Sequence, residues 1–451
     1  MLITIVSFVL VLGVLVFLHE LGHYWVARRH GIEVVEFGMG YPPRIWKLFT
    51  YDGTDFTLNA IPFGGFARMK GEDAGDMSPG SFNAASRMGR ALTLLAGPAM
   101  NALIAVILFA ASFMAGFPAP AGRPQVTGVV AGSMAAAAGI QPGDVLLELN
   151  SRPVQVNPVP DMNYKVMARP AQNSDGQAQL LLSRDGRIQE VQLPEGATSA
   201  ELLTGVEYAP VLSTEITLVA DDSPAQTAGI EPGDLVYSVN DETISLDSTL
   251  SDVILAHAGE PVDITVLRGT QWETLQATPR VDPPPGEGAL GVGIGLTNTL
   301  ARLPLLASLR EGVKETVGYA VLILKLPVML IMGQLAPSEA QLSGPVGIAR
   351  FVGGAVNATI DTGLWFPILR LTAVLSAALA ITNMLPIPAL DGGRLLFIAI
   401  EALRGRRINP EREGLVHMVG FVVLIGLLLF ITVRDIMTPQ QGIDWVSILG
   451  Q

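Results

Sequence analysis

The side chains best suited to chemistry in this sequence are His19, Glu20 and His23. They lie in the stretch Phe17-Leu18-His19-Glu20-Leu21-Gly22-His23. Two residues four positions apart share one face of a helix, so both imidazoles can reach the same metal ion. Glu20 lies beside them and can accept a proton from an attacking water. The spacing therefore predicts a metal-dependent hydrolytic site.

The residues before this stretch strengthen that interpretation. An ordinary pair of helical surface histidines is the alternative, but residues 2–18 carry no charge. A polar cluster at the end of a lipid-buried helix is costly and indicates a functional site. The chain has no cysteine, so a metal must be held by His, Asp or Glu.

Composition places the chain among integral membrane proteins. Of 451 residues, 49% are hydrophobic and only 15% are charged, and the mean hydropathy is +0.44. The first apolar segment has no basic region before it and no cleavage site after it, so we expect a retained helix and not a signal peptide. The net charge of −13 argues against binding of nucleic acid.

Four segments are long and apolar enough to cross a bilayer. A fifth candidate, residues 317–332, is interrupted by Lys325 and Pro327, so we expect it to be interfacial or re-entrant. The fold class expected is therefore a polytopic α-helical membrane protein with four transmembrane helices. These helices are expected at about residues 2–27, 91–113, 364–385 and 415–433.

Basic residues predict the orientation of these helices. Eight lie between Arg28 and Arg90 and five between Arg394 and Arg412, so both of these loops should be cytoplasmic. The long region between the second and third spans should then lie outside the cytoplasm. His19 falls roughly 26 Å into a hydrocarbon core of about 30 Å, near its cytoplasmic face.

The same topology points to a third metal ligand. The third span should end at the cytoplasmic face, just before Leu390-Asp391-Gly392-Gly393, and catalytic zinc commonly has three protein ligands. Asp391 is therefore the predicted third ligand, and a helix cap is its alternative role. We interpret the other three histidines as ordinary polar residues: His30, His257 and His417.

Two further features flank the predicted site. The stretch Phe56–Ile61 alternates and Pro62–Phe66 has turn chemistry, which predicts a short hairpin near the membrane. The hairpin either presents an exposed edge that pairs with an extended substrate or is a simple connecting loop. The residues concerned are Phe56, Leu58, Ala60, Gly64, Gly65 and Phe66. In the second span, Gly97-Pro98 and Asn101 indicate a helix contact near the site, or ordinary helix packing.

The long outer region contains an internal repeat. Ala138-Gly139-Ile140-Gln141-Pro142-Gly143-Asp144 recurs 90 residues later as Ala228-Gly229-Ile230-Glu231-Pro232-Gly233-Asp234. Both copies resemble PDZ domains, which bind an extended peptide by strand addition or serve here as spacers and size filters. By resemblance to circularly permuted PDZ folds, the peptide loops would contain Gly205, Val206, Leu290, Gly291 and Val292.

Together these motifs resemble the site-2 proteases over essentially the full length. The matching motifs include His19 to His23, Asn383 to Pro388, Leu390-Asp391-Gly392, Gly97-Pro98-x-x-Asn101 and Ser343-Gly344-Pro345. The resemblance implies Zn²⁺ ligation by His19, His23 and Asp391, and catalysis by Glu20. It also implies a substrate-binding or transition-state role for Asn383. A second asparagine that the family often carries five positions earlier is Ala378 here.

The resemblance further implies a monomeric protease of the bacterial inner membrane with periplasmic PDZ domains. Its substrates would be single-pass membrane proteins such as anti-sigma factors, which another protease has first cut outside the cytoplasm. Remnant signal peptides would be a second substrate class. The resemblance implies a role in envelope stress signalling. The rival hypothesis is a catalytically silent scaffold that tethers peptides; too few spans argue against a transporter. The expected divisions are 1–116 (first two spans), 117–208 and 209–297 (PDZ domains), 298–363 (interfacial) and 364–451 (last two spans).

Overall fold

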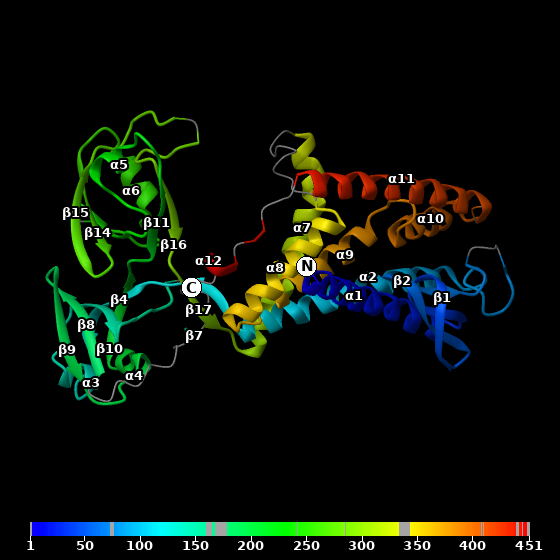
Figure 1. The fold of residues 1–451 in the computed structure, drawn as a ribbon, viewed down its shortest axis with the longest axis horizontal. Coiled ribbons are helices and arrows are strands. Elements are labelled where there is room, and N and C mark those ends of the chain that lie inside the picture. Colours follow the sequence, from blue (N-terminus) through cyan, green and yellow to red (C-terminus); the bar gives the residue numbers. More distant parts are fainter. Residues whose placement is uncertain are drawn as a thin grey trace. The chain divides into compact units, whose positions relative to one another are not determined.

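The protein, described by a computed structural model, consists of two compact units (Figure 1). One unit is mainly helical and combines Met1–Ala115 with Pro304–Val446; the other is mainly β and comprises Gly116–Leu303 with Ser447–Gln451. The described residues are 1–451 without 1, 73–75, 159–164, 167–177, 241, 285, 333–342, 407, 409, 439–441, 444 and 449–451.

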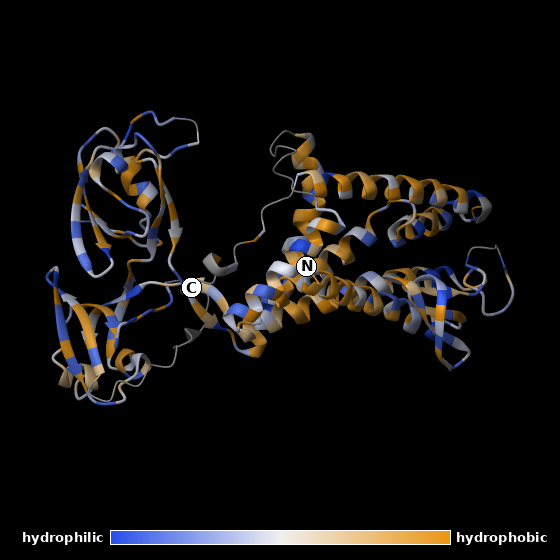
Figure 2. Cartoon of the chain, in the orientation of Figure 1, coloured by the Kyte–Doolittle hydropathy of each residue, from blue (hydrophilic) through white to orange (hydrophobic). Residues whose placement is uncertain are grey.

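Four helices of the first unit are long and apolar enough to cross a membrane, as predicted. Hydrophobic residues predominate along most of their length (Figure 2). A lipid environment accounts for the many exposed leucines, valines and phenylalanines on the last of these helices, α11. The four helices are α1 (Leu2–Arg29), α2 (Arg87–Ala115), α9 (Phe366–Met384) and α11 (Pro410–Met437).

Helix α2 packs against both α1 and α9. A Cβ added to Gly22 of α1 would lie 2.4 Å from the main-chain oxygen of Ala96, so glycine permits this close approach. On the other side, the Ser376 hydroxyl of α9 donates to the main-chain oxygen of Asn101 at 2.7 Å. Small residues and one buried hydroxyl therefore hold three of the long helices together.

The doubtful fifth segment lies within a continuous helix, α7 (Leu305–Ile331), which is not among the four candidate spans. Pro327 lies inside α7 without ending it. The first half of α7 packs on α2, because a Cβ on Gly312 would lie 2.6 Å from the Val106 oxygen. Arg370 at the start of α9 forms an ion pair with Glu315 of α7 at 3.0 Å.

Two further helices of the first unit are α8 and α10. Helix α8 (Pro345–Thr362) begins directly after Ser343-Gly344, and its Gly347 N–H donates to the Asp435 carboxylate of α11 at 2.7 Å. This buried carboxylate satisfies a helix N-terminal donor that would otherwise be orphaned in lipid. The other helix, α10 (Asp391–Arg404), starts at the predicted third ligand.

The predicted hairpin is wrong in extent. Strands β1 (Val34–Tyr51) and β2 (Thr54–Met69) are much longer than Phe56–Phe66, and their two-residue connection is Asp52-Gly53, with positive φ at both positions. The chain bends again near Gly64, where φ is +82°, so that Phe37 lies opposite both Phe56 and Ala67. The Asp-Gly dipeptide was the available signal for the main turn.

The second unit contains two sheets of the same strand pattern. The first has the order β10-β4-β5-β8-β9 and the second β15-β14-β12-β11-β16, so β10 and β16 are edge strands. The first sheet comprises β4 (Arg123–Val129), β5 (Val145–Leu149), β6 (Arg152–Pro153), β8 (Ala178–Arg184), β9 (Arg187–Leu193) and β10 (Val206–Val211), with α3 (Met134–Ala137) and α4 (Ser199–Thr204). The second comprises β11 (Thr214–Val219), β12 (Leu235–Val239), β13 (Glu242–Thr243), β14 (Val262–Arg268), β15 (Gln271–Ala277) and β16 (Val292–Leu296), with α5 (Pro224–Ala228) and α6 (Leu250–Ala256).

The repeated motif performs the same structural task in both sheets. Asp144 accepts from the Arg184 guanidinium at 2.7 Å, and Asp234 accepts from Arg268 at 2.7 Å. Each aspartate is almost fully buried, so its paired hydrogen bonds to arginine keep the charge satisfied. In each module, an ion pair therefore joins the turn of the repeated motif to a neighbouring strand.

The predicted boundary between residues 208 and 209 falls inside β10, which is paired with β4. The first module therefore extends to Val211. A third small sheet joins β3 (Phe117–Pro120), β17 (Asn298–Arg302) and β7 (Lys165–Val166). The strands that enter and leave the unit are thus paired with each other.

Candidate metal centre

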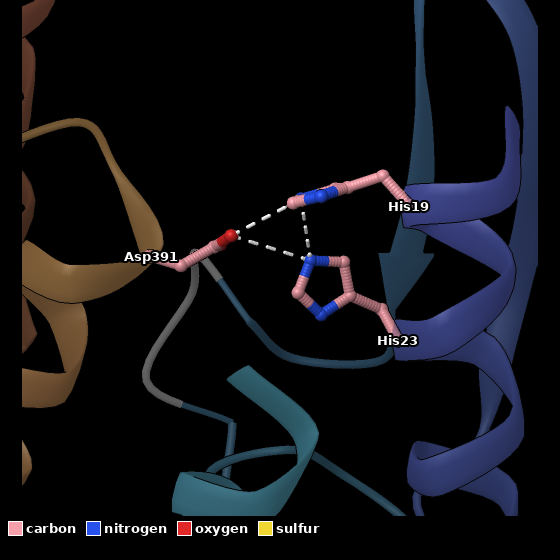
Figure 3. A group of neighbouring side chains, drawn as sticks. All are labelled: His19, His23 and Asp391. Atoms are coloured by element: carbon pink, nitrogen blue, oxygen red, sulfur yellow. Dashed lines mark hydrogen bonds and ion pairs between the residues drawn. The ribbon is translucent and has the colours of Figure 1, made fainter. Parts of the chain in front are cut away.

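Asp391 meets His19 and His23 at one point, although it lies more than 360 residues later in the sequence (Figure 3). The Nε2 atoms of His19 and His23 are 3.1 Å apart, and they lie 3.2 and 3.4 Å from Asp391 Oδ2. Ligands that are each about 2.0–2.1 Å from a tetrahedral zinc ion lie roughly 3.3 Å from one another. The three separations therefore match the edges of a tetrahedral zinc site.

Helix α1 positions the two histidines, which are both buried. The His23 Nδ1–H donates to the main-chain oxygen of Thr93 at 2.7 Å. A carbonyl oxygen only accepts, so this hydrogen bond leaves the Nε2 lone pair free toward the cluster. The tautomer of His23 is thus the one that a metal ion requires.

The turn before α10 positions Asp391. Ala389 has a φ of +76°, and its N–H donates to the His417 Nδ1 of α11 at 2.8 Å. The following glycines allow close packing, because a Cβ on Gly392 would lie 2.3 Å from the oxygens of Met384 and Leu385. The Asp-Gly-Gly sequence is therefore required by the geometry of this turn.

The carboxylate form of Asp391 is favoured. Burial raises the pKa of the Asp391 carboxyl, but hydrogen bonds and charge interactions with His19 and His23 outweigh burial and hold that pKa well below its usual range. A carboxyl group binds a metal ion in its deprotonated form, so this side chain is ready to bind a cation.

Helix α2 contributes a stripe of three residues at four-residue spacing: Thr93, Gly97 and Asn101. A Cβ on Gly97 would lie 2.3 Å from His23 Nε2 and 2.7 Å from His19 Nε2. One turn before Gly97, the Thr93 main-chain oxygen lies within hydrogen-bonding distance of His23 Nδ1. One turn after Gly97, the Asn101 side chain lies at a similar distance from His19 Nδ1. The helix contact that Gly97-Pro98 and Asn101 indicated is therefore a contact with the candidate ligands.

Ion pairs hold α10 against α2 and against the segment that follows β2. Arg90 of α2 is buried and donates to Glu401 of α10 at 2.8 Å, and Arg87 reaches the same carboxylate at 3.2 Å. Near the start of α10, Arg394 pairs with Glu72. The two pairs with Glu401 connect α10, which starts at Asp391, to the first turn of α2. The distribution of basic residues predicts that this end of α2 is cytoplasmic.

The β1–β2 hairpin lies against Glu20. The Ala67 N–H donates to Glu20 Oε2 at 3.0 Å, and a Cβ on Gly65 would lie 3.6 Å from Glu20 Cγ. One edge of β2 therefore faces the carboxylate next to the histidines. The sequence did not identify Ala67 or Thr93 as site residues, because each acts through its main chain. Gly97 was singled out only as part of a helix contact, and its role depends on its lack of a side chain.

The remaining predicted residues lie in different places. Asn383 is half-buried in the last turn of α9, next to the connection that leads to Asp391. His30 and His257 each contact a main-chain oxygen four residues earlier, at Val26 and Val253, away from the cluster.

The proposed peptide loops of the β modules precede the edge strands β10 and β16. The N–H groups of Gly205 and Gly291 donate to the oxygens of Leu202 and Gly288. A Cβ on Gly291 would lie 2.4 Å from Ser223 Cβ. The loops themselves are therefore closely packed, and they adjoin β10 and β16, each of which ends the strand order of its sheet.

The sequence matches Peptidase family M50 over residues 7–427. It is 28% identical over 449 residues to the "Regulator of sigma E protease" of Haemophilus influenzae, covering 95% of this chain and 97% of that protein. The "Zinc metalloprotease RasP" of Geobacillus kaustophilus is 31% identical over 458 residues, covering 96% of this chain and 97% of the relative. The "Regulator of sigma-E protease RseP" of Escherichia coli is 29% identical over 450 residues, covering 94% and 97%. The chain belongs to Peptidase family M50, the site-2 proteases, and is a zinc metalloprotease.

Proposed function

We propose that the protein hydrolyses peptide bonds within the transmembrane segments of single-pass membrane proteins. The observation that carries this proposal is the position of the cluster. Two histidines with an adjacent glutamate lie in the second half of a membrane-spanning helix, and Asp391 joins them from another element. Water and a metal ion at this position are useful only to a reaction that takes place at the membrane.

In this proposal His19, His23 and Asp391 hold the zinc ion, and Glu20 is the general base. Bound zinc would supply Lewis-acid chemistry, making a water more acidic and polarising the scissile carbonyl. Glu20 accepts the water proton as the new C–O bond forms, then donates a proton to the amine as the C–N bond breaks. Its place in the chain next to the proposed ligand His19 supports this role.

Asn383 is proposed to bind the substrate main chain or to stabilise the developing oxyanion. Its amide is both donor and acceptor, which suits either role. Its position at the end of α9, eight residues before Asp391, supports this assignment.

The β1–β2 hairpin is proposed to hold the substrate in an extended form. A transmembrane helix hides its carbonyls in its own hydrogen bonds, so it must unwind before water can attack. The edge of β2 beside Glu20 supports this role, because a strand added there would lie next to the catalytic residues. The residues concerned are Phe56, Leu58, Ala60, Gly64, Gly65 and Phe66.

The two β modules are proposed to be PDZ domains that screen substrates outside the cytoplasm. Their edge strands β10 and β16 suit the addition of a peptide strand beside the loops with Gly205, Val206, Leu290, Gly291 and Val292. The relatives named as regulators of sigma E support substrates of the anti-sigma-factor type. The membrane is the bacterial inner membrane, with the catalytic site near its cytoplasmic face.

The decisive experiment compares the purified wild-type chain with Glu20→Gln on a tagged single-pass substrate whose outer domain has been shortened. We expect cleavage by the wild type only, with about one zinc per chain in both proteins, because glutamine keeps the shape but cannot accept a proton. If neither protein cuts and both bind peptide through the β modules, the chain is a tethering scaffold and not a protease.

A further inference from the structure

Asn101 has an unpaired polar atom inside the helical unit. Its side chain is buried, with 1% of the residue exposed, and its Oδ1 lacks a hydrogen-bond partner among the residues that the structure describes. Its Nδ2 lies 3.2 Å from His19 Nδ1. An unsatisfied amide oxygen within a membrane helix is costly, so its orientation toward His19 has a chemical reason.

The protonation of His19 supplies that reason. His19 Nε2 faces Asp391 and His23, so a metal ion in the cluster uses the Nε2 lone pair. The ring proton of a neutral imidazole then lies on Nδ1. An amide NH₂ and an Nδ1–H are both donors and cannot bond to each other, whereas a half-turn of the amide about its Cβ–Cγ bond brings Oδ1 to the same place.

The arrangement around His23 is the same in chemical terms. There the Thr93 main-chain oxygen accepts from Nδ1–H at 2.7 Å. Thr93 and Asn101 are eight residues apart on α2, and Gly97 lies midway between them. His19 and His23 are four residues apart on α1. Each histidine Nδ1 therefore lies within hydrogen-bonding distance of one polar group of α2.

We propose that Asn101 is a positioning residue that accepts a hydrogen bond from His19 Nδ1–H through Oδ1. The bond holds the tautomer and ring orientation that direct Nε2 toward zinc. The inference rests on the proposed ligand role of His19 and extends it to a residue on another helix. The Ser376 hydroxyl, which donates to the Asn101 main-chain oxygen, fixes the height of Asn101 relative to α9.

The test measures zinc affinity by chelator competition, together with the visible spectrum of the cobalt-substituted protein, in the purified full chain. Asn101→Leu removes the acceptor at similar volume, and Asn101→Asp keeps an acceptor oxygen. We expect Asn101→Leu to weaken zinc binding about 10- to 100-fold and alter the cobalt spectrum, while Asn101→Asp stays within a few-fold of wild type. Ser112→Ala is the matched control, since Ser112 is buried on the same helix and contacts only Phe109 among the hydrogen bonds described.

Unchanged zinc affinity in Asn101→Leu would overturn the inference. So would a loss in Asn101→Asp as large as that in Asn101→Leu, because the acceptor oxygen would then be irrelevant. If Asn101→Leu does not fold, Asn101→Ala takes its place in both comparisons, because alanine also lacks the acceptor oxygen. Failure of the wild type to bind zinc would instead contradict the proposed ligand set, which separates the two claims.

Discussion

At the scale of single residues, the site depends as much on what is missing as on what is present. The imidazoles of His19 and His23 can converge because Gly97 has no side chain. Any Cβ there would lie well inside the contact distance of both Nε2 atoms. Gly97 is thus part of the metal site without contributing a ligand atom.

Replacing Gly97 with alanine should therefore disrupt metal binding while leaving the fold in place. The added methyl must displace at least one imidazole, and we expect zinc affinity to fall about 10- to 100-fold. Chelator competition and metal content on the purified protein measure this.

Gly13→Ala is the matched control for that substitution. Gly13 lies in membrane helix α1, and nothing is within 4 Å of an added Cβ. Wild-type zinc affinity in Gly97→Ala would show that the histidines do not bind metal in this arrangement.

At the scale of elements, the edge of β2 lies beside Glu20, the proposed general base. The Ala67 N–H already donates to Glu20, so a main chain that lies along this edge is close to the base. The hairpin register places Gly38 opposite both Phe66 and Thr57, so β1 pairs with both halves of the folded-back β2.

Strand addition at this edge predicts a specific cross-link. The native chain has no cysteine, so Phe66→Cys in the Glu20→Gln background introduces one defined thiol. Cβ atoms of adjacent strands lie about 4.5–5.5 Å apart, close enough for a disulfide with small adjustment. We expect oxidation to join Phe66→Cys to a substrate with a cysteine next to its cleavage site.

The control for the cross-link is Tyr51→Cys, at the exposed far end of the same hairpin. Gel mobility before and after reduction measures the product. Equal cross-linking at positions 51 and 66, or none at either, would argue against strand addition at the β2 edge.

At the scale of the whole molecule, the β unit is an insertion between two membrane-spanning helices. Its entry strand β3 and exit strand β17 are paired, with Leu300 opposite Pro118. Removal of the intervening modules therefore need not separate the ends of α2 and α7. This makes the screening role of the modules testable apart from catalysis.

Replacing residues 123–296 with a short glycine-serine linker should abolish discrimination between substrates and spare cleavage. We expect the wild type to cut a substrate with a shortened outer domain at least about tenfold faster than the intact one, and the variant to cut both within about twofold. Parallel time courses with both substrates measure the ratio. A variant that retains the wild-type ratio would show that selection occurs elsewhere.

Much of the organisation was predictable from local patterns. Hydropathy alone predicted the four membrane-spanning helices, because the bilayer fixes the length and polarity of each. Spacing predicted His19 and His23 on one helix face, and topology predicted Asp391 near them. The repeat predicted two similar modules. In each module the aspartate of the repeated turn forms an ion pair with an arginine of a neighbouring strand.

Other features were decided only by the tertiary structure. Thr93 and Ala67 act through main-chain atoms, which every residue has, so their types carry no signal. Gly97 was part of a predicted helix contact, but only the packing of α2 placed it against both imidazoles. The extent of β1 was missed because its exposed half, including Trp46 and Phe49, lacks the alternation that a half-buried strand shows. The sequence determined which side chains can bind zinc; the packing of α2 between α1 and α9 decided how they are held.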